Sequence, residues 1–143
     1  MADKHRFSTF YVGSIFCGVD VEIVQEVVRC QSVTRVPLAP HIVRGLINLR
    51  GQIVAAIDLR RRLGMSESRP SEFQLSLMVR TVDGVVSLLV DDIGEVVEVE
   101  EATLELPPPT VDVKRRELFS GIYKLSDRLM HVLDVEQAVK FAA

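Results

Sequence analysis

The chain has 143 residues, of which 48% are hydrophobic, and its formal net charge at pH 7 is −3. This length suits one compact domain or two small barrels that share a core, and the high apolar content excludes a disordered chain. The mildly acidic balance argues against a nucleic acid as partner, because binding to a phosphate backbone requires a basic patch.

Residues 20–28 carry a mixed signal. Their apolar members recur with the spacing of one helix face, whereas their β-branched side chains favour a strand. These members are Ile23, Val24, Val27 and Val28. We expect a short helix or an irregular bend that passes into a strand.

Residues 52–57 form a nearly all-apolar run, which predicts a strand buried on both faces. Arg50 and Gly51 come directly before it and predict a tight turn, because glycine is free to adopt a positive φ. After the strand, Asp58 can cap a short helix that ends at Gly64.

Two further features concern short helices. Asp134 can cap a final helix that runs through Phe141, with Glu136 well placed in its first turn. The basic run of residues 60–62 lies in the helix capped by Asp58, and we expect it to form a solvated face rather than a contact with nucleic acid.

The second half of the chain opens on a hairpin. Residues 73–79 alternate between apolar and polar side chains, which predicts a half-buried strand. The Asp83-Gly84 pair predicts a tight turn, and residues 85–90 form the return strand. Residues 96–99 predict another strand, separated from the previous one by polar residues and glycine between positions 91 and 94.

Prolines and polar residues punctuate the chain. Residues 107–109 are three consecutive prolines, which predict an extended surface loop; a ligand for a proline-binding domain is the alternative. The polar stretch at residues 66–72 includes a proline and is the best candidate for a divide between two halves.

An internal repeat relates the two halves. Residues 45–59 align without a gap to residues 121–135, and both predict a strand, a tight turn, a second strand and a capped helix. In this alignment Gly45 matches Gly121, Ile53 matches Leu129 and Asp58 matches Asp134. A weaker similarity relates residues 24–28 to residues 93–97. Two similar halves rich in short strands predict two small barrels packed together, and chance similarity between two hairpins is the alternative.

The sequence offers no set of residues for catalysis. Its three histidines, His5, His41 and His131, are scattered, and no zinc or phosphate-loop motif is present. Asp91 and Asp92 are adjacent, so on a strand their carboxylates would point to opposite faces. Cys17 and Cys30 lack metal-ligand spacing and are expected to be small buried apolar residues. We therefore expect no enzyme activity, no metal and no cofactor.

Membrane segments are not expected. The polar start of the chain lacks the apolar stretch of a signal peptide, and no apolar run reaches the roughly 18 residues of a spanning helix. We expect a cytoplasmic protein that reaches a membrane only through another protein.

Several segments together resemble the CheW family. Residues 43–60, Val-Arg-Gly-Leu-Ile-Asn-Leu-Arg-Gly-Gln-Ile-Val-Ala-Ala-Ile-Asp-Leu-Arg, are similar to the signature segment of that family. Residues 24–37, 90–97 and 118–135 resemble its other segments, so the resemblance covers residues 7–141. Ala55 stands where the family often has proline, and Asp92 where it often has glycine.

The resemblance implies an all-β fold of two SH3-like, five-stranded barrels in a single CheW-like domain. It also implies a free-standing adaptor that bridges methyl-accepting chemoreceptors and the regulatory domain of a CheA-type histidine kinase. The same adaptor chemistry in another pathway, such as pilus-driven motility, is an alternative that the sequence does not separate. A small enzyme of unknown type is the alternative from another class.

Roles for individual residues also follow from the resemblance. Val24, Glu26 and Arg50 match family positions linked to receptor coupling, and Ile53 matches a position at the kinase contact. The repeat adds Val27, Ile93 and Val96, so that Val24 and Val27 of one half would face Ile93 and Val96 of the other across a cleft between the barrels. Gly45, Gly51, Gly121, Asp58 and Asp134 are expected to be structural.

Two of these assignments have a structural alternative. Val24 and Ile53 would be plain core residues if their strands were buried, because apolar residues in strands mostly lie in the core. Glu26 and Arg50 would be structural if they paired with each other.

Overall fold

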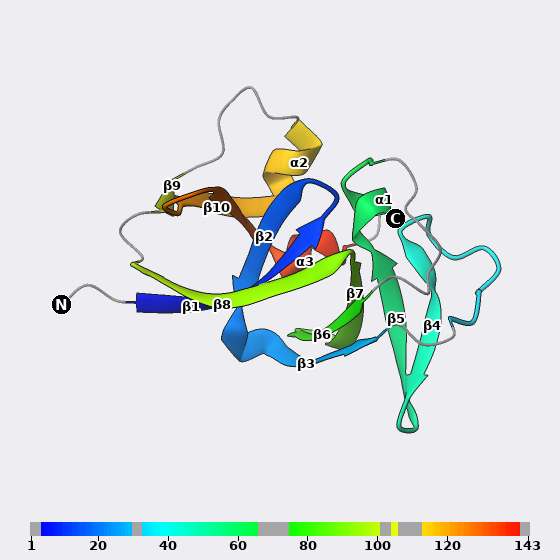
Figure 1. Cartoon of the computed structure of the whole chain (residues 1–143). Helices are drawn as coiled ribbons and strands as arrows, with labels where there is room; N and C mark the ends of the chain where they lie inside the picture. Colours follow the sequence, from blue (N-terminus) through cyan, green and yellow to red (C-terminus); the bar gives the residue numbers. More distant parts are fainter. Residues whose placement is uncertain (1–3, 30–32, 66–74, 101–103, 106–112, 141–143) are drawn as a thin grey trace.

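A computed structural model describes residues 4–29, 33–65, 75–100, 104–105 and 113–140, and strands dominate them (Figure 1). The elements in chain order are β1 (Lys4–Val12), β2 (Ile15–Asp20), the 3-10 helix η1 (Val21–Ile23), β3 (Val24–Arg29), β4 (Val43–Leu49), β5 (Gln52–Asp58), α1 (Leu59–Arg62), β6 (Leu75–Thr81), β7 (Gly84–Val90), β8 (Asp92–Glu100), β9 (Leu104–Glu105), α2 (Val113–Leu118), β10 (Phe119–Lys124), β11 (Leu129–Leu133) and α3 (Val135–Ala138). The expectation of a mainly β protein with short helices is confirmed.

The strands form two sheets of the same design. One has the order β3-β6-β7-β5-β4, and the other has the order β8-β1-β2-β11-β10-β9. With the two-residue strand β9 set aside, each sheet pairs an edge strand with a hairpin, and the hairpin pairs in parallel with a strand of a second hairpin. We call the part built on the first sheet lobe 1 and the part built on the second lobe 2.

The repeated hairpins occupy equivalent places in the two lobes. In β4–β5, Gly45 pairs with Ala56 directly after a β-bulge, and in β10–β11, Gly121 pairs with Val132 directly after a β-bulge. The hairpins also make the same parallel contact, β5 with β7 and β11 with β2. The repeat is therefore structural rather than a chance similarity between hairpins.

The weaker similarity is structural as well. Val24 pairs with Val79 at the start of β3, and its counterpart Ile93 pairs with Phe10 at the start of β8. A β-bulge follows each of these pairs, so both edge strands bend at the same position.

The lobes divide the chain differently from the predicted halves. Lobe 1 takes the strands between residues 24 and 90, whereas lobe 2 combines β1 and β2 with the strands after residue 91. Figure 1 shows the N-terminal hairpin β1–β2 beside β8, and β11 pairs with β2 on the other side of the hairpin. Residues 66–72 lie outside the described residues, and the elements that flank them, α1 and β6, both belong to lobe 1.

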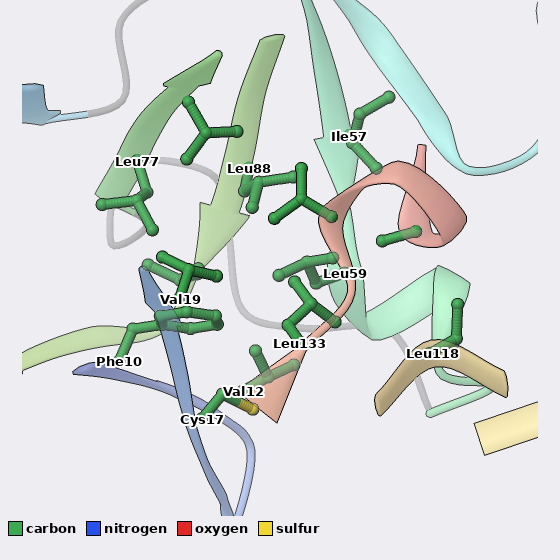
Figure 2. Close-up of a cluster of buried hydrophobic side chains, with 14 of the residues drawn as sticks. Phe10, Val12, Cys17, Val19, Ile57, Leu59, Leu77, Leu88, Leu118 and Leu133 are labelled. Carbon is green, nitrogen blue, oxygen red and sulfur yellow. The ribbon is translucent and has the colours of Figure 1, made fainter. Parts of the chain in front are cut away.

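A shared apolar cluster joins the lobes (Figure 2). Its buried members come from strands of both sheets and from the short helices. They are Phe10, Val12, Cys17, Val19, Ile57, Leu59, Leu63, Leu77, Val79, Leu88, Val90, Leu118, Phe119, Leu133, Val135 and Ala138. Full burial of a valine, leucine, isoleucine or phenylalanine side chain stabilises a protein by about 1.5–3 kcal/mol, so this cluster fixes the two lobes against each other.

Each lobe also encloses its own smaller core. At one pair of equivalent positions the two cores are filled by different side chains. In lobe 2, Phe7 fills the interior above Gly18, where an added Cβ would lie 2.7 Å from the sulfur of Met130. In lobe 1, the hydroxyl groups of Ser76 and Ser87 are hydrogen-bonded to each other at the equivalent place, and both residues are fully buried.

The buried Ser76 corrects one prediction. Strand β6 is not half-buried, because Leu77 and Val79 pack in the shared cluster on one face and Met78 packs in a second apolar cluster on the other, so residues 76–79 are all buried. The polar residue in the alternating pattern is Ser76, whose hydroxyl group is hydrogen-bonded to that of Ser87 inside the protein. The pattern therefore does not mark a solvent-facing side of the strand.

Other predicted elements differ in extent. Residues 52–57 are not buried on both faces throughout, because Gln52 and Ile53 are exposed where the hairpin extends beyond the sheet. Strand β8 begins at Asp92, so only Asp91 separates it from β7. The final helix ends at Ala138 instead of Phe141, which lies outside the described residues, as does the proline run 107–109. The bend at residues 20–28 is present as η1 followed by β3, as predicted.

Candidate protein-interaction surface

Strands β3 and β8 each form one edge of their sheet, and they carry the four predicted apolar receptor residues. Val24 and Ile93 are half-buried and pack on the shared cluster. Val27 pairs with Leu77 and Val96 pairs with Ser8, so both lie on the same strand faces as Val24 and Ile93. Their side chains are 42% and 55% exposed. Val24 therefore contributes to the core, as the structural alternative for this residue expects, but it is only half-buried.

Glu26 and Arg50 form an ion pair. Glu26 lies at the bulge of β3, and Arg50 lies in the β4–β5 turn with a φ of 52°. Because β3 and β4 are opposite edges of one sheet, the ion pair connects the two edges and supports closure of lobe 1. The pair is nevertheless open to solvent, with the Arg50 side chain 69% exposed and that of Glu26 26% exposed.

Ile53 follows the same turn and is 58% exposed, so it is a surface residue and not part of the core. Its counterpart in the repeat, Leu129, is 46% exposed at the start of β11. Leu129 is not among the predicted site residues, although its ungapped alignment with Ile53 marks it as the equivalent exposed position of lobe 2.

Gly45 lies where the chain crosses itself closely. Thr34 and Leu46 exchange two backbone hydrogen bonds of 2.8 Å, which brings residues 33–34 against β4. A Cβ on Gly45 would collide with the carbonyl oxygen of Thr34, and the φ of Gly45 is +156°. Gly51 completes the β4–β5 turn with a φ of +86°. Gly121 is buried at the equivalent bulge of lobe 2.

Asp58 and Asp134 cap equivalent helices, as predicted. The carboxylate of Asp58 accepts the backbone N–H of Arg61 at 3.2 Å, and that of Asp134 accepts the backbone N–H of Gln137 at 3.2 Å. The two capping residues also share an extended backbone with a φ of −85°.

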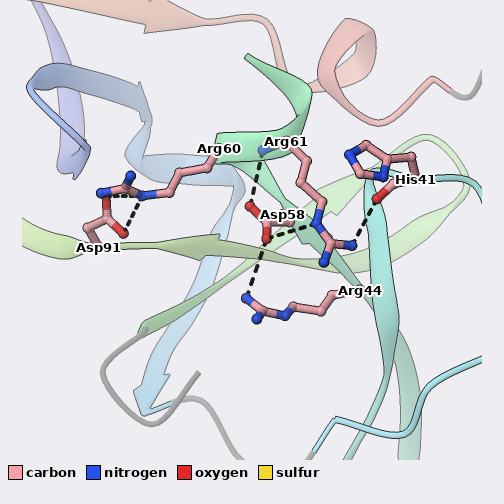
Figure 3. A network of polar contacts seen from close by, with 6 residues as sticks. All are labelled: His41, Arg44, Asp58, Arg60, Arg61 and Asp91. Atoms are coloured by element: carbon pink, nitrogen blue, oxygen red, sulfur yellow. Dashed lines mark hydrogen bonds and ion pairs between the residues drawn. The ribbon is translucent and has the colours of Figure 1, made fainter. Parts of the chain in front are cut away.

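The three arginines of α1 are not a solvated face. Arg60 donates to both carboxylate oxygens of Asp91 at 3.1 and 2.9 Å (Figure 3). Asp91 also accepts the backbone N–H of Gly13, so this ion pair joins α1 of lobe 1 to the β1–β2 turn of lobe 2. Arg62 donates to the backbone oxygens of Gln137 and Ala138 in α3 at 3.0 Å each. Arg60 and Arg62 thus join the lobes, because their side chains reach fixed acceptors beyond lobe 1, whereas Arg61 donates to the backbone oxygen of His41 within lobe 1.

The described residues contain no group of three or more histidine, cysteine, aspartate or glutamate side chains that could hold a metal. Asp91 and Asp92 do not converge, since Asp91 binds Arg60 while Asp92 accepts its neighbouring backbone N–H. Burial raises the pKa of the Cys17 thiol to about 12, which keeps this sulfur protonated and unreactive. No helix among these residues is long and apolar enough to cross a membrane.

Comparisons with known proteins agree with this geometry. The CheW-like domain family matches residues 6–142. The chemotaxis protein CheW of Thermotoga maritima is 31% identical over 132 residues, which cover 92% of this chain and 85% of the relative. The chemotaxis protein CheW of Helicobacter pylori is 29% identical over 135 residues, which cover 94% of this chain and 81% of the relative. The protein FrzA of Myxococcus xanthus is 28% identical over 123 residues, covering 86% and 76%.

A solved structure has the same fold. The crystal structure of the scaffolding protein TtCheW from Thermoanaerobacter tengcongensis matches 98% of this chain and 90% of that chain, with a TM-score of 0.86 and 28% sequence identity. The predicted pair of SH3-like barrels is confirmed by this match and by the two equivalent lobes. The chain belongs to the CheW-like domain family.

Proposed function

We propose that this protein is a non-enzymatic chemotaxis adaptor that couples methyl-accepting chemoreceptors to a CheA-type histidine kinase in the cytoplasm. The observation that carries the proposal is the pair of equivalent edge strands, β3 and β8, which present the exposed Val27 and Val96 beside the boundary of the lobes. The relatives named chemotaxis protein CheW and the scaffolding protein TtCheW support the adaptor role.

The receptor contact is assigned to these two strands. A receptor tip made of helices would present an apolar helix face, which docks on apolar residues flanked by a few charges. Val24, Val27, Ile93 and Val96 supply the apolar surface. Glu26 and Arg50 supply charges at its edge, where they set orientation and association rate more than affinity.

The kinase contact is assigned to the exposed Ile53 at the far end of the β4–β5 hairpin. The receptor contact centres on β3 and β8 and the kinase contact on the β4–β5 hairpin, and the two adjoin at the turn where Arg50 precedes Ile53. Neither contact requires a nucleotide or a metal, and recruitment to the membrane runs through the receptor.

A second candidate is an adaptor of the same design in a different kinase pathway, for which the similarity to the protein FrzA gives only weak support. The two candidates share every contact described above and differ only in which receptor and kinase are bound. A small enzyme of unknown type is the remaining alternative and has no supporting residue among those described.

Co-sedimentation tests the proposal directly. The purified chain is mixed with a CheA-type kinase and with membranes that contain a chemoreceptor. We expect the kinase to sediment with the membranes only when the chain is present, without added metal. Sedimentation of the kinase to the same extent without the chain, or failure of the chain to bind either partner, would contradict the adaptor role.

A further inference from the structure

A junction cavity of about 420 Å³ lies between the two lobes. Arg80 of β6 lines it from lobe 1, and its apolar lining comes from η1 and from lobe 2 and includes Phe7, Ile23, Tyr123, Leu133 and Val135. None of its lining residues belongs to the receptor contact or to the kinase contact. Mostly apolar pockets of this size, placed where two domains meet, are typical of small-molecule sites. We propose that the junction cavity binds a small amphipathic cation, an organic amine with an apolar or aromatic body.

The apolar wall of the junction cavity contains two aromatic rings. The rings of Phe7 and Tyr123 have centroids 5.5 Å apart and are tilted by 50°. Both residues are buried, as are Leu133 and Val135 in the same lining. An aromatic or aliphatic body placed here would leave water and pack on fixed side chains, whereas a hydrated inorganic ion would gain nothing from them. The wall therefore favours an organic ligand.

Three carboxylates also line the junction cavity, those of Asp20, Asp134 and Glu136. Each accepts one backbone N–H at a distance between 2.9 and 3.2 Å, which holds it in place. A carboxylate can accept about four hydrogen bonds, so acceptor capacity remains for a ligand. None of the three forms an ion pair with a residue that the structure describes. Against them the lining has one guanidinium, that of Arg80, and one imidazole, that of His5, so a cationic ligand is favoured.

The repeat provides an internal control for the charge of Asp134. Its lobe 1 counterpart, Asp58, lies 3.4 Å from Nη1 of Arg44 and 3.6 Å from Nε of Arg61 (Figure 3). The residues of lobe 2 that are equivalent to these two arginines are uncharged, namely Ser120 and Gln137. Asp134 is half-buried, and partial burial strengthens its attraction for a cation because screening by water is reduced. A ligand ammonium group would thus take the place that the arginines occupy in lobe 1.

The arrangement of the carboxylates favours an ammonium group over a metal ion. The described residues contain no group of three or more histidine, cysteine, aspartate or glutamate side chains that could hold a metal, so the three carboxylates do not converge on one point. A protonated amine needs only one or two of them, because each of its N–H groups makes its own hydrogen bond. Such hydrogen bonds between charged groups are stronger than neutral ones. An amine at Asp134 or Glu136, with its body against Phe7 and Tyr123, would use both kinds of lining.

The test uses the ¹⁵N-labelled full chain and 2-phenylethylamine, which is protonated at neutral pH. We expect saturable shifts of the amide resonances of residues 5–7, 20–23 and 132–136. Two analogues separate the charge from the ring: 2-phenylethanol has the ring without the charge, and 3-phenylpropionate has the ring with the opposite charge. Each analogue should bind at least about tenfold more weakly than the amine, because it lacks the charged hydrogen bonds to the carboxylates.

Two variants and a matched control complete the test. Ser120→Arg introduces the type of residue that lobe 1 has at the equivalent position and places a cation beside Asp134, so it should weaken amine binding at least about tenfold. Glu136→Gln keeps an acceptor for the backbone N–H of Val82 but removes the charge, and it should weaken binding about threefold or more. Ser126→Arg adds the same charge at an exposed serine of lobe 2 outside the lining and should leave binding unchanged. Thermal unfolding verifies that each variant is folded.

Every other result of the titration overturns the proposal. Equal affinity for 2-phenylethanol would show an apolar site without charge recognition, and equal affinity for methylamine would show a cation site without an apolar wall. Binding of the peptide acetyl-Lys-Phe-amide at least about tenfold tighter than that of the amine would identify a segment of a partner protein as the occupant. The absence of saturable shifts, or unchanged affinity in both cavity variants, would exclude the site. None of these measurements involves the kinase or the receptor, so the proposed function stands or fails separately.

Discussion

Arg50 in the β4–β5 turn forms an ion pair with Glu26 on β3, and the pair joins the two edge strands of the same sheet. It is both a structural link and an exposed pair of charges beside the proposed receptor surface. An exposed ion pair stabilises a protein by about 0–1 kcal/mol, so a larger effect of mutation on function than on stability would indicate a contact with a partner.

Glu26→Lys should abolish receptor control of the kinase at physiological salt. The substitution places a like charge beside Arg50 and reverses the charge offered to the receptor. The free energy of unfolding should fall by no more than about 1 kcal/mol, because the side chains are open to water. Kinase affinity should be unchanged. Denaturant unfolding, kinase affinity and receptor-dependent kinase activation are measured on the same variant.

The double variant Glu26→Arg, Arg50→Glu separates the two roles. It restores an ion pair between β3 and the turn but exchanges the positions of the charges. If the pair acts only as a link within lobe 1, the exchange restores receptor control. If the receptor reads the individual charges, stability recovers while receptor control remains lost, which is the result we expect.

Ile53→Asp should weaken kinase binding by at least tenfold while the fold survives. The side chain is 58% exposed, so the charge costs little in the free protein but must be desolvated at the interface. Val82→Asp is a matched control, because Val82 is an 84% exposed apolar residue in the β6–β7 turn. Circular dichroism verifies folding, and calorimetry measures affinity. Equal loss of affinity in both variants would argue against a specific role for Ile53.

The features predicted from the sequence are those that local chemistry determines. The turn at Arg50 and Gly51 follows from the freedom of glycine at positive φ, and the caps at Asp58 and Asp134 follow from side-chain acceptors before short helices. The ungapped repeat predicted two equivalent hairpins because each carries the same local signals.

The features missed depend on contacts between distant residues. The burial of Ser76 follows from its pairing with Ser87, while Arg60 binds Asp91 between the two lobes and Arg62 binds α3 of lobe 2. Similarly, lobe 2 is built from both ends of the chain because β1 pairs with β8, and no local pattern in the sequence indicates this pairing. The exposure of Ile53 depends on how far the hairpin projects beyond its sheet.

Gly45→Ala should destabilise the protein far more than Gly51→Ala. At position 45 the added methyl group meets the backbone oxygen of Thr34, which cannot move without breaking the hydrogen bonds to Leu46. We expect a loss of more than about 2 kcal/mol there. At position 51 nothing lies within 4 Å of the added Cβ, so only the positive φ costs energy, about 1–2 kcal/mol. Urea unfolding compares the two, and equal losses would contradict the close approach at Gly45.

The two helix caps should respond differently to the same change. Asp134→Ala removes one capping hydrogen bond and should cost about 1 kcal/mol. Asp58→Ala removes the equivalent bond and also the carboxylate beside Arg44 and Arg61, so it should cost at least about 2 kcal/mol. Asp58→Asn keeps a capping acceptor without the charge and should fall between them. Thermal unfolding of the three variants measures the order, and an equal cost for both alanine variants would show that the arginines contribute nothing to stability.

The buried thiol of Cys17 should make stability depend on pH in alkaline solution. Burial raises its pKa to about 12, whereas the thiol of an unfolded chain ionises near about 8.5. Because the folded state holds its proton more tightly, the stabilisation is complete below about pH 8.5 and is lost as pH rises toward 12. Cys17→Val introduces the type of residue that lobe 1 has at the equivalent position, Val86, and removes this titration. We therefore expect the wild type to lose more stability against urea between pH 7.5 and pH 9.5 than the variant, because the two proteins differ only in this thiol. Parallel pH profiles of the wild type and the variant would mean that the thiolate of Cys17 is tolerated in the folded protein. Rapid alkylation of Cys17 under native conditions, measured in a Cys30→Ser background, would lead to the same conclusion.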